Sequence, residues 1–418
     1  MIAAYAVPDV RAAEAAAMAQ LPDGELMARA AAGLAQVLAA RVRGRTRVVV
    51  LAGPGDNGGD ALYAAAGLAT DLPGAQITAV LVSEQVHPGA LAAARESGVR
   101  LLPPGEGDEP ASEATEALGR AAVVVDGMLG IGGRPGLRGT MARLAAAVPD
   151  EAYVVAVDLP SGQDPAGRVS PAAAVTADET VTFGVPKPLH LLPATEAACG
   201  LLTVVDIGLT EQQQARRLLG APAVERLTHD DAAQLWPVPG LADDKYSRGV
   251  VGVLAGSEQY PGAAVLVSRG AVEAGAGMVR YVGPRRAQDL VLAAMPEVVP
   301  GPGRVQAWVV GPGLPVPSGG SATADRDETE RLALARDVLA GELAEQPCVV
   351  DAGALDLVTG RRPGPTLLTP HAGELARLLS RLAGRQLERA DVTADPAECA
   401  TLAARLTGAT VLLKGGTT

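Results

Sequence analysis

Short apolar runs rich in valine and leucine recur along the chain, and each gives way to glycine and then to an alanine-rich stretch. Unbroken apolar runs of about 4–8 residues are typical of strands buried on both faces of a parallel sheet. In the first half, the runs that predict strands are 47–53, 77–83, 121–127, 153–159 and 201–208. The stretches between them that predict helices are 60–70, 88–97, 110–119 and 139–147. This alternation predicts a doubly wound, Rossmann-like α/β sheet.

A second set of apolar runs follows a polar segment rich in proline and aspartate. Its predicted strands are 249–256, 277–283, 307–313, 347–353 and 409–416. We therefore expect two α/β domains, at 1–212 and 246–418, joined by a linker at 213–245. The opening segment, 9–43, predicts two helices separated by the sequence PDGE, and the segment 315–329 predicts a loop in solvent.

Composition narrows the class of protein. The 418 residues include 35 Lys and Arg against 47 Asp and Glu, a net charge of −12, and only 2% are aromatic. An acidic chain with few aromatic residues does not fit a nucleic-acid module that works by basic patches and base stacking. Three scattered cysteines predict neither a disulfide framework nor a zinc site. No apolar run is long enough for a membrane span and no secretory leader is recognisable, so we expect a cytoplasmic protein without membrane partners.

The glycine-rich sequence GPGDNGGD lies at 53–60, directly after a predicted strand and before a predicted helix. Its first three spaced glycines match the G-x-G-x-x-G fingerprint of dinucleotide-binding turns, a match that is weak when taken alone. Consecutive glycines allow backbone N–H groups to converge on an anion at a helix N-terminus. However, Asp56 and Asp60 place carboxylates beside this turn. Crowded carboxylates near a phosphate favour a bound cation or a raised pKa.

Two further predicted strands end in polar side chains. Asp126 precedes a flexible glycine loop, and Asp158 and Ser161 lie in the sequence DLPSG. Ligands in open α/β sheets bind outside the carboxyl ends of the strands, so these loops are expected to meet. Asn57, Asp126 and Ser161 offer hard oxygen ligands for one cation, and Asp158 is suited to exchange protons with a substrate. The alternative is that the aspartates only cap loops.

Candidate binding residues in the second half also follow predicted strands. The sequence YPGAA begins an amphipathic helix after a glycine-rich turn, and GPGLP forms another tight turn. His371 and Glu374 lie three residues apart at a predicted helix start, where Glu374 would serve equally well as a first-turn capping residue. Lys414 follows the last predicted strand, a position suited to a phosphate.

These motifs carry a family resemblance. GPGDNGGD, DGMLGIGGRPG, DLPSG and VTFGVPKPLH resemble the NAD(P)H-hydrate epimerase family, the YjeF N-terminal domain, over about residues 9–210. The resemblance implies a potassium ion held by Asn57, Asp126 and Ser161. It also implies a catalytic role for Asp158 and for Lys187, which matches the family's lysine after the FG turn.

The same resemblance implies a set of contacts with the hydrated nicotinamide cofactor. Those residues are Asp56, Asn57, Gly58, Gly59, Asp60, Gly130, Ile131, Gly132, Gly133, Arg134, Pro135, Gly136 and Asp158. One departure is visible, because Asp56 stands where the family usually has the first asparagine of an Asn-Asn pair. This departure places an extra negative charge next to the phosphate of the substrate.

In the second half, YPGAA, GPG, VVDAGALD, LLTPHAGE and LLKGGTT resemble the ADP-dependent NAD(P)H-hydrate dehydratases, which have a ribokinase-like fold. The resemblance implies substrate contacts at Ala263, Gly313 and His371, and ADP, with Mg²⁺, as the second ligand. The implied nucleotide contacts are Lys414, Gly415, Gly416, Thr417 and Thr418. The family pattern continues to a GSGD segment, whereas this chain stops at Thr418, so we expect an incomplete second domain with little dehydratase activity.

The whole chain therefore resembles the bifunctional NAD(P)H-hydrate repair proteins. Such a protein interconverts the R and S forms of NADHX and NADPHX at C6 and dehydrates the S form with ADP, and a homo-oligomer is compatible with the resemblance. Two alternatives remain at this point. One is a ribokinase-type small-molecule kinase fused to a non-catalytic Rossmann-like binding domain, and the other is a binding protein without enzymatic activity. A dehydrogenase fits less well, because Glu84 is the nearest acidic residue after the first glycine turn.

Overall fold

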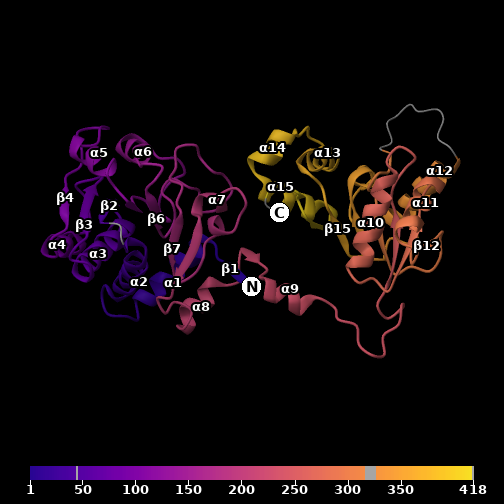
Figure 1. Ribbon diagram of the computed structural model, residues 1–418, viewed down its shortest axis with the longest axis horizontal. Coiled ribbons are helices and arrows are strands. Elements are labelled where there is room, and N and C mark those ends of the chain that lie inside the picture. Colours follow the sequence, from indigo (N-terminus) through magenta and orange to yellow (C-terminus); the bar gives the residue numbers. More distant parts are fainter. Residues whose placement is uncertain (44–45, 316–325, 417–418) are drawn as a thin grey trace. The chain divides into compact units, whose positions relative to one another are not determined.

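The computed structural model describes residues 1–43, 46–315 and 326–416. The chain divides into two compact units, Met1–Asp231 and Ala232–Thr418, which are coloured indigo to magenta and magenta to yellow in Figure 1. Among the described residues, no helix combines the length and the hydrophobicity needed to span a bilayer.

The first unit is built on a seven-stranded parallel sheet with the order β4-β3-β2-β5-β6-β7-β8. Its strands are β2 (Arg47–Ala52), β3 (Gln76–Leu81), β4 (Arg100–Leu102), β5 (Val123–Gly127), β6 (Tyr153–Val157), β7 (Glu179–Phe183) and β8 (Leu201–Val205). The chain builds outward from β2 to β4 and then returns to place β5 on the other side of β2. The order of the strands thus reverses between β2 and β5, which is where doubly wound sheets bind ligands.

Helices cover both faces of this sheet, and its central strands β2, β5 and β6 are largely apolar. Val48 and Val50 of β2 belong to a core shared with α2 and α3, whereas Val49 and Leu51 belong to a second core shared with α5 and α6. Figure 1 shows these two pairs of helices on opposite faces of the sheet. The helices of the unit are α1 (Val7–Met18), α2 (Glu25–Val42), α3 (Asp56–Asp71), α4 (Pro88–Glu96), α5 (Ser112–Leu118), α6 (Gly139–Ala146), α7 (Glu196–Cys199) and α8 (Gln213–Leu219). A short antiparallel pair, β1 (Ile2–Ala4) and β9 (Val224–Arg226), and a 3₁₀ turn, η1 (Pro188–His190), complete it.

Helix α3 begins earlier than the sequence predicts. The pattern placed a glycine-rich turn at 53–60 and a helix from residue 60, but the helix already starts at Asp56. Gly58 packs so closely against Gly53 that a Cβ at residue 58 would overlap the Gly53 backbone. The glycines therefore allow the first turn of α3 to lie directly on the preceding loop.

The second unit repeats the same principle with a seven-stranded parallel sheet of order β12-β11-β10-β13-β14-β15-β16. Its strands are β10 (Val250–Leu254), β11 (Met278–Val282), β12 (Val299–Pro300), β13 (Ala307–Val310), β14 (Cys348–Val350), β15 (Thr366–Leu368) and β16 (Thr410–Val411). Its helices are α10 (Pro261–Glu273), α11 (Arg285–Ala294), α12 (Arg326–Ala340), α13 (Ala372–Ala383), α14 (Arg389–Ala394) and α15 (Pro396–Thr407), with a 3₁₀ helix, η2 (Ala352–Leu357). Helix α9 (His229–Leu235) lies at the division between the units. The order of the strands reverses between β10 and β13.

The prediction of two α/β domains with parallel sheets is confirmed. The predicted strands were the long valine-rich runs, and the polar strand β7 and the short strands β4, β12 and β15 were missed. The predicted loop at 315–329 is too long at its C-terminal end, because α12 starts at residue 326. Residues 316–325 of that loop lie outside the described part of the chain.

We predict opposite effects on stability for two matched glycine substitutions in neighbouring helices. A Cβ at Gly33 of α2 would overlap the Val205 side chain, whereas at Gly67 of α3 it would lie 3.4 Å from the Ala35 Cβ. Gly33→Ala should therefore lower the free energy of unfolding by about 1–3 kcal/mol. Gly67→Ala should raise it by up to about 1 kcal/mol through helix propensity. Urea denaturation measures both, and equal effects of the two substitutions would contradict this packing.

Candidate functional site

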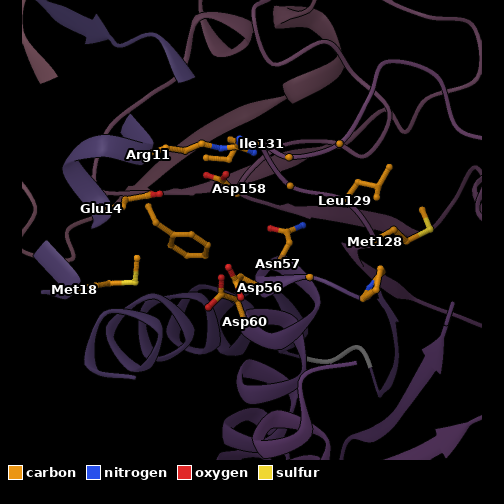
Figure 2. Close-up of a pocket in the computed structure, with 16 residues that line it drawn as sticks. Arg11, Glu14, Met18, Asp56, Asn57, Asp60, Met128, Leu129, Ile131 and Asp158 are labelled. Carbon is orange, nitrogen blue, oxygen red and sulfur yellow. The ribbon is translucent and has the colours of Figure 1, made fainter. Parts of the chain in front are cut away.

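A cavity of about 530 Å³ opens at the carboxyl ends of the central strands of the first unit (Figure 2). Its walls come from the start of α3, from the loop that follows β5, from Asp158 after β6 and from Phe183 at the end of β7. Helix α1 contributes Arg11, Glu14 and Met18. The cavity therefore lies at the carboxyl ends of the strands, as the sequence predicts, and at the point where the order of the strands reverses.

Asp158 is held in an unusual backbone conformation beside a buried lysine. Its φ is 63°, in the left-handed region, so β6 ends at the preceding residue. The Asp158 Oδ1 accepts hydrogen bonds from the Lys187 Nζ at 2.5 Å and from the Thr182 hydroxyl at 2.9 Å. The Lys187 ammonium is fully buried and also donates to the Thr182 Oγ1 at 2.9 Å. Burial by itself raises the pKa of Asp158, but the charge and hydrogen bond of Lys187 hold that pKa below its ordinary value.

His190 fixes the backbone on which this ion pair is built. Its Nδ1 accepts the hydrogen bond of the Lys187 backbone N–H at 3.0 Å, so its proton lies on Nε2, which is 2.9 Å from the Asp158 carbonyl oxygen. Burial lowers the pKa of His190 to about 4, with a further lowering by Lys187. The neutral imidazole thus connects the backbones of both members of the ion pair, and sequence reasoning did not single it out.

Asp126 and Ser161 meet next to the loop that follows β5. Asp126 is fully buried, and its carboxylate accepts hydrogen bonds from the Ser161 hydroxyl at 2.6 Å and the Ser161 N–H at 2.7 Å. Ser161 Oγ accepts in turn from the Leu129 N–H at 2.9 Å. Burial raises the pKa of Asp126 to about 6, and the hydrogen bonds from Ser161 and Met128 offset only part of this. Among the described residues, no ion pair neutralises Asp126.

Asn57 approaches the same loop from the start of α3. A Cβ at Gly130 would lie 3.2 Å from the Asn57 Cβ and 3.3 Å from its Oδ1, so the asparagine side chain lies against this glycine. Asn57 is buried, and its Nδ2 has no hydrogen-bond partner among the described residues. The three predicted cation ligands are thus gathered around 127–130. Their amide, carboxylate and hydroxyl oxygens, together with a buried carboxylate that no ion pair neutralises, fit a cation that prefers oxygen ligands.

Two further carboxyl groups, those of Glu14 and Asp60, lie near the Asp158–Lys187 pair. The pKa of Glu14 is raised to about 7, mainly by burial; the charge of Lys187 opposes this shift and that of Asp158 adds to it. Burial also raises the pKa of Asp60 well above its ordinary value, with smaller contributions from Asp158 and Asp56. Asp60 Oδ1 is buried without a hydrogen-bond partner among the described residues. The cavity therefore holds an ionised aspartate close to two carboxyl groups, Glu14 and Asp60, whose pKa values are raised.

The other residues expected to contact the cofactor fall into two groups. Asp56, Gly130, Ile131, Gly132 and Gly133 line the cavity. Gly58 and Gly59 are buried inside α3, and Arg134, Pro135 and Gly136 are not among the residues that line the cavity. The start of α3 and the first half of the 130–136 loop thus line the cavity, while the remaining positions lie in the backbone around it.

In the second unit, two predicted substrate positions lie side by side after β10 and β13. Gly313 has a φ of 72°, and a Cβ there would lie 2.9 Å from the Ala263 Cβ and 3.2 Å from the Tyr260 carbonyl oxygen. Ala263 lies in the first turn of α10. The close approach of these two backbones requires glycine and a small residue.

The other predicted positions form a polar cluster at the carboxyl ends of β14, β15 and β16. His371 caps α13 by accepting from the Glu374 N–H, and the Glu374 carboxylate accepts from the His371 N–H at 2.8 Å. The Lys414 N–H binds the Pro370 carbonyl next to His371, and the Lys414 Nζ lies 2.7 Å from the Asp351 Oδ1. Gly415 and Gly416 follow, and the predicted contacts Thr417 and Thr418 lie outside the described residues.

Comparison with known proteins now assigns the family. Residues 23–189 match the family model for the YjeF-related protein N-terminus, and residues 251–418 match the model for NAD(P)H-hydrate dehydratase. Over 99% of its length the chain is 45% identical to the bifunctional NAD(P)H-hydrate repair enzyme Nnr of Mycobacterium tuberculosis, of which it covers 81%. The chain belongs to the bifunctional NAD(P)H-hydrate repair enzyme family.

Further relatives match the two units separately. The NAD(P)H-hydrate epimerase of Clavibacter sepedonicus is 43% identical over 49% of this chain and 90% of its own length. A crystal structure of the ADP/ATP-dependent NAD(P)H-hydrate dehydratase from Bacillus subtilis, co-crystallised with ATP/Mg²⁺, is 27% identical, with a TM-score of 0.36, and covers 45% of this chain and 65% of that one. Membership of the repair enzyme family favours a bifunctional repair enzyme over the alternative of a small-molecule kinase fused to a binding domain.

Several residues of the repair enzyme's first site were missed in the sequence. The clearest is Glu14, which lies three residues after Arg11 and four before Met18, so all three share one face of α1. Thr182 and His190 were missed because their functional contacts are with Asp158, which lies more than 20 residues away in the sequence. In the second unit, Asp351 was missed as the partner of Lys414.

We predict that Lys187→Met destabilises the protein by about 3–5 kcal/mol at neutral pH, because it leaves the buried Asp158 carboxylate without a cation. The loss should shrink as the pH is lowered, since without Lys187 the pKa of Asp158 rises and a protonated carboxyl needs no cation. The double variant Asp158→Asn with Lys187→Met should recover part of the loss. Urea denaturation of the single and double variants measures the coupling, and additive losses would contradict the ion pair.

Proposed function

We propose that the first unit interconverts the R and S epimers of NADHX and NADPHX at C6, the carbon that bears the added hydroxyl. The observation that carries the proposal is an ionised, buried aspartate, paired with a lysine, that faces a cavity at the reversal of the strand order. A carboxylate in this position is suited to accept a proton from a bound substrate or from water. The names of the relatives support the substrate and the reaction.

The backbone around the cavity is suited to hold the rest of the dinucleotide. Helix α3 has 16 residues, and its N-terminus at Gly55 and Asp56 faces the cavity. Free N–H groups at such a terminus favour phosphate oxygens. The exposed Asp56 opposes this attraction, so we propose that the glycine loop 130–133 supplies the remaining contacts and that phosphate binding is weaker than an asparagine at residue 56 would allow.

We propose K⁺ as the cation held by Asn57, Asp126 and Ser161. When bound, it would neutralise the buried Asp126 carboxylate and attract substrate oxygens. The residues themselves contact the loop 127–130. The Ser161 Oγ accepts a hydrogen bond from the Leu129 N–H, and the Asn57 side chain packs against Gly130. This ordering would keep the glycine loop in the position that lines the cavity.

For the second unit we propose binding of the hydrated cofactor near Ala263, Gly313 and His371, with ADP and Mg²⁺ near Lys414, followed by ADP-dependent dehydration. Support comes from the adjacency of Ala263 and Gly313 and from the cluster that joins His371 to Lys414. Lys414 carries a positive charge at the end of β16, where it can move from Asp351 to a phosphate. The proposal includes the cytoplasm as the place of action and small molecules as the partners.

We predict that the purified protein restores the equilibrium ratio of the epimers when it is given one enantiomer of NADHX, as followed by chromatography. Asp158→Asn should lower the rate above the uncatalysed background by about 10²–10⁴-fold, because it removes the proton acceptor. Glu96→Gln, an exposed substitution on α4, is the control and should leave the rate unchanged. A wild-type rate in Asp158→Asn would instead favour a binding protein in which only the shape of the cavity matters.

We predict that K⁺ raises both the epimerase rate and the thermal stability relative to Li⁺ at equal ionic strength, because it neutralises Asp126. Ser161→Ala should weaken this selective stabilisation by removing one ligand. Differential scanning fluorimetry with the two chlorides provides a readout that does not depend on activity. Equal melting temperatures in the two salts would contradict the cation site.

The formation of NADH from S-NADHX and ADP, followed by absorbance, tests the second unit. The proposal predicts that Lys414→Met raises the KM for ADP by at least about tenfold, since a charge-assisted phosphate contact of about 1.5–3 kcal/mol is lost. The rate at which the wild-type protein forms NADH also distinguishes this proposal from the expectation from the sequence that dehydration is slow. An unchanged KM in the variant would contradict the role of Lys414.

A further inference from the structure

Glu14 is a carboxyl group of the first site to which neither the sequence motifs nor the proposed chemistry has given a role. It projects from the middle of α1, whose buried face (Val10, Ala13 and Ala17) packs into the core of the unit. Figure 2 shows the Glu14 side chain directed from α1 toward the cavity, which Asp158 also lines. A glutamate on a surface helix normally points into water. The position of Glu14 inside this cavity therefore suggests a chemical role.

The surroundings of Glu14 can be described group by group. Its own helix contributes Arg11, α3 contributes Asp56 and Asp60, and the loops after β6 and β7 contribute Asp158 and Lys187. Lys187 donates its hydrogen bonds to Asp158, Thr182 and Phe183, so its charge is committed to the other carboxylate. Glu14 is therefore a carboxyl group in a half-closed site whose nearest buried cation already has a partner.

We propose that Glu14 is the general acid of the epimerase site and acts opposite the general base Asp158. This inference rests on the proposed function of the first unit. The two carboxyl groups line one cavity, but their surroundings differ. Asp158 has a buried ammonium and a hydroxyl as donors, whereas among the described residues no hydrogen-bond donor stabilises the Glu14 carboxylate. Two carboxyl groups whose environments drive their proton affinities apart are the arrangement that acid–base pairs require.

The proposed step can be written with every proton and electron pair placed. Glu14 donates its proton to the hydroxyl on C6, the C6–O bond breaks with its electron pair going to oxygen, and water leaves. The lone pair of the ring nitrogen N1 forms the N1=C6 bond of an iminium ion. Water then adds to the other face of C6, the N1=C6 electron pair returns to nitrogen, and Asp158 accepts the proton that the water loses. The reverse reaction uses the two carboxyl groups in exchanged roles.

Burial supports the assignment through its effect on protonation. The pKa of Glu14 is raised to about 7 by burial and by Asp158 and Asp56, against the opposing charges of Lys187 and Arg11. Glu14 is therefore half protonated near neutral pH, while the pKa of Asp158 is held below its ordinary value. An acid must be protonated to work, so the rate should fall as the pH rises through about 7.

The test is the pH profile of epimerisation in the full chain, measured for wild type, Glu14→Gln, Glu14→Asp and the surface control Glu96→Gln. We expect Glu14→Gln to lower kcat by about 100-fold or more and to abolish the fall in rate above neutral pH. Glu14→Asp should retain that fall with a smaller loss of kcat. Unchanged melting temperatures would show that the variants remain folded.

Each other outcome counts against the assignment. If Glu14→Gln keeps the wild-type rate, or loses rate but keeps the wild-type fall with pH, Glu14 is not the acid, although the epimerase function stands. If KM rises while kcat and the pH profile stay unchanged, Glu14 only helps to bind substrate. A wild-type protein that does not interconvert the epimers at any pH would remove both the proposed function and the role of Glu14.

Discussion

The structure around the cavity of the first unit depends on one buried negative charge, that of the Asp158 carboxylate. An isolated buried carboxylate is several kcal/mol too costly to remain ionised, so Asp158 depends on the ammonium of Lys187 and the hydroxyl of Thr182. His190 then ties the backbones of both partners together. Because these residues follow or end β6 and β7, the ion pair also connects two strand ends. These contacts therefore tie this wall of the cavity to the sheet beneath it.

Both units place candidate binding residues at the same topological position. In the first, Asn57 follows β2 and Asp126 ends β5, the two strands between which the order reverses. In the second, Ala263 and Gly313 meet after β10 and β13, which flank the other reversal. A parallel sheet directs all its strand ends to one edge, so loops distant in sequence converge without long connections. The same physical rule thus supplies a candidate site in each half of the repair enzyme.

The sequence predicted elements and site residues that follow a local pattern. It did not predict those whose role depends on burial in the folded protein. Valine-rich strands buried on both faces were readable, as were Asp126 and Asp158 at their ends. Strand β7 was not, because Glu179 lies within it and is buried only through its contacts with Arg41, Tyr153 and Thr203. Glu14 was equally hidden, since one glutamate in an alanine-rich helix looks like a solvent-facing residue. Its environment arises only when α1 is placed beside the cavity.

The left-handed backbone at Asp158 restricts evolution at this position in two independent ways. Apart from glycine, aspartate and asparagine are among the few residues that tolerate such a conformation readily. Asparagine would abandon the charge that Lys187 requires, and glutamate would keep the charge but bring a longer chain onto an unfavourable backbone. Replacement of Asp158 by a chemically similar residue alone is therefore disfavoured. We expect such a replacement to require compensating changes in the residues that contact it.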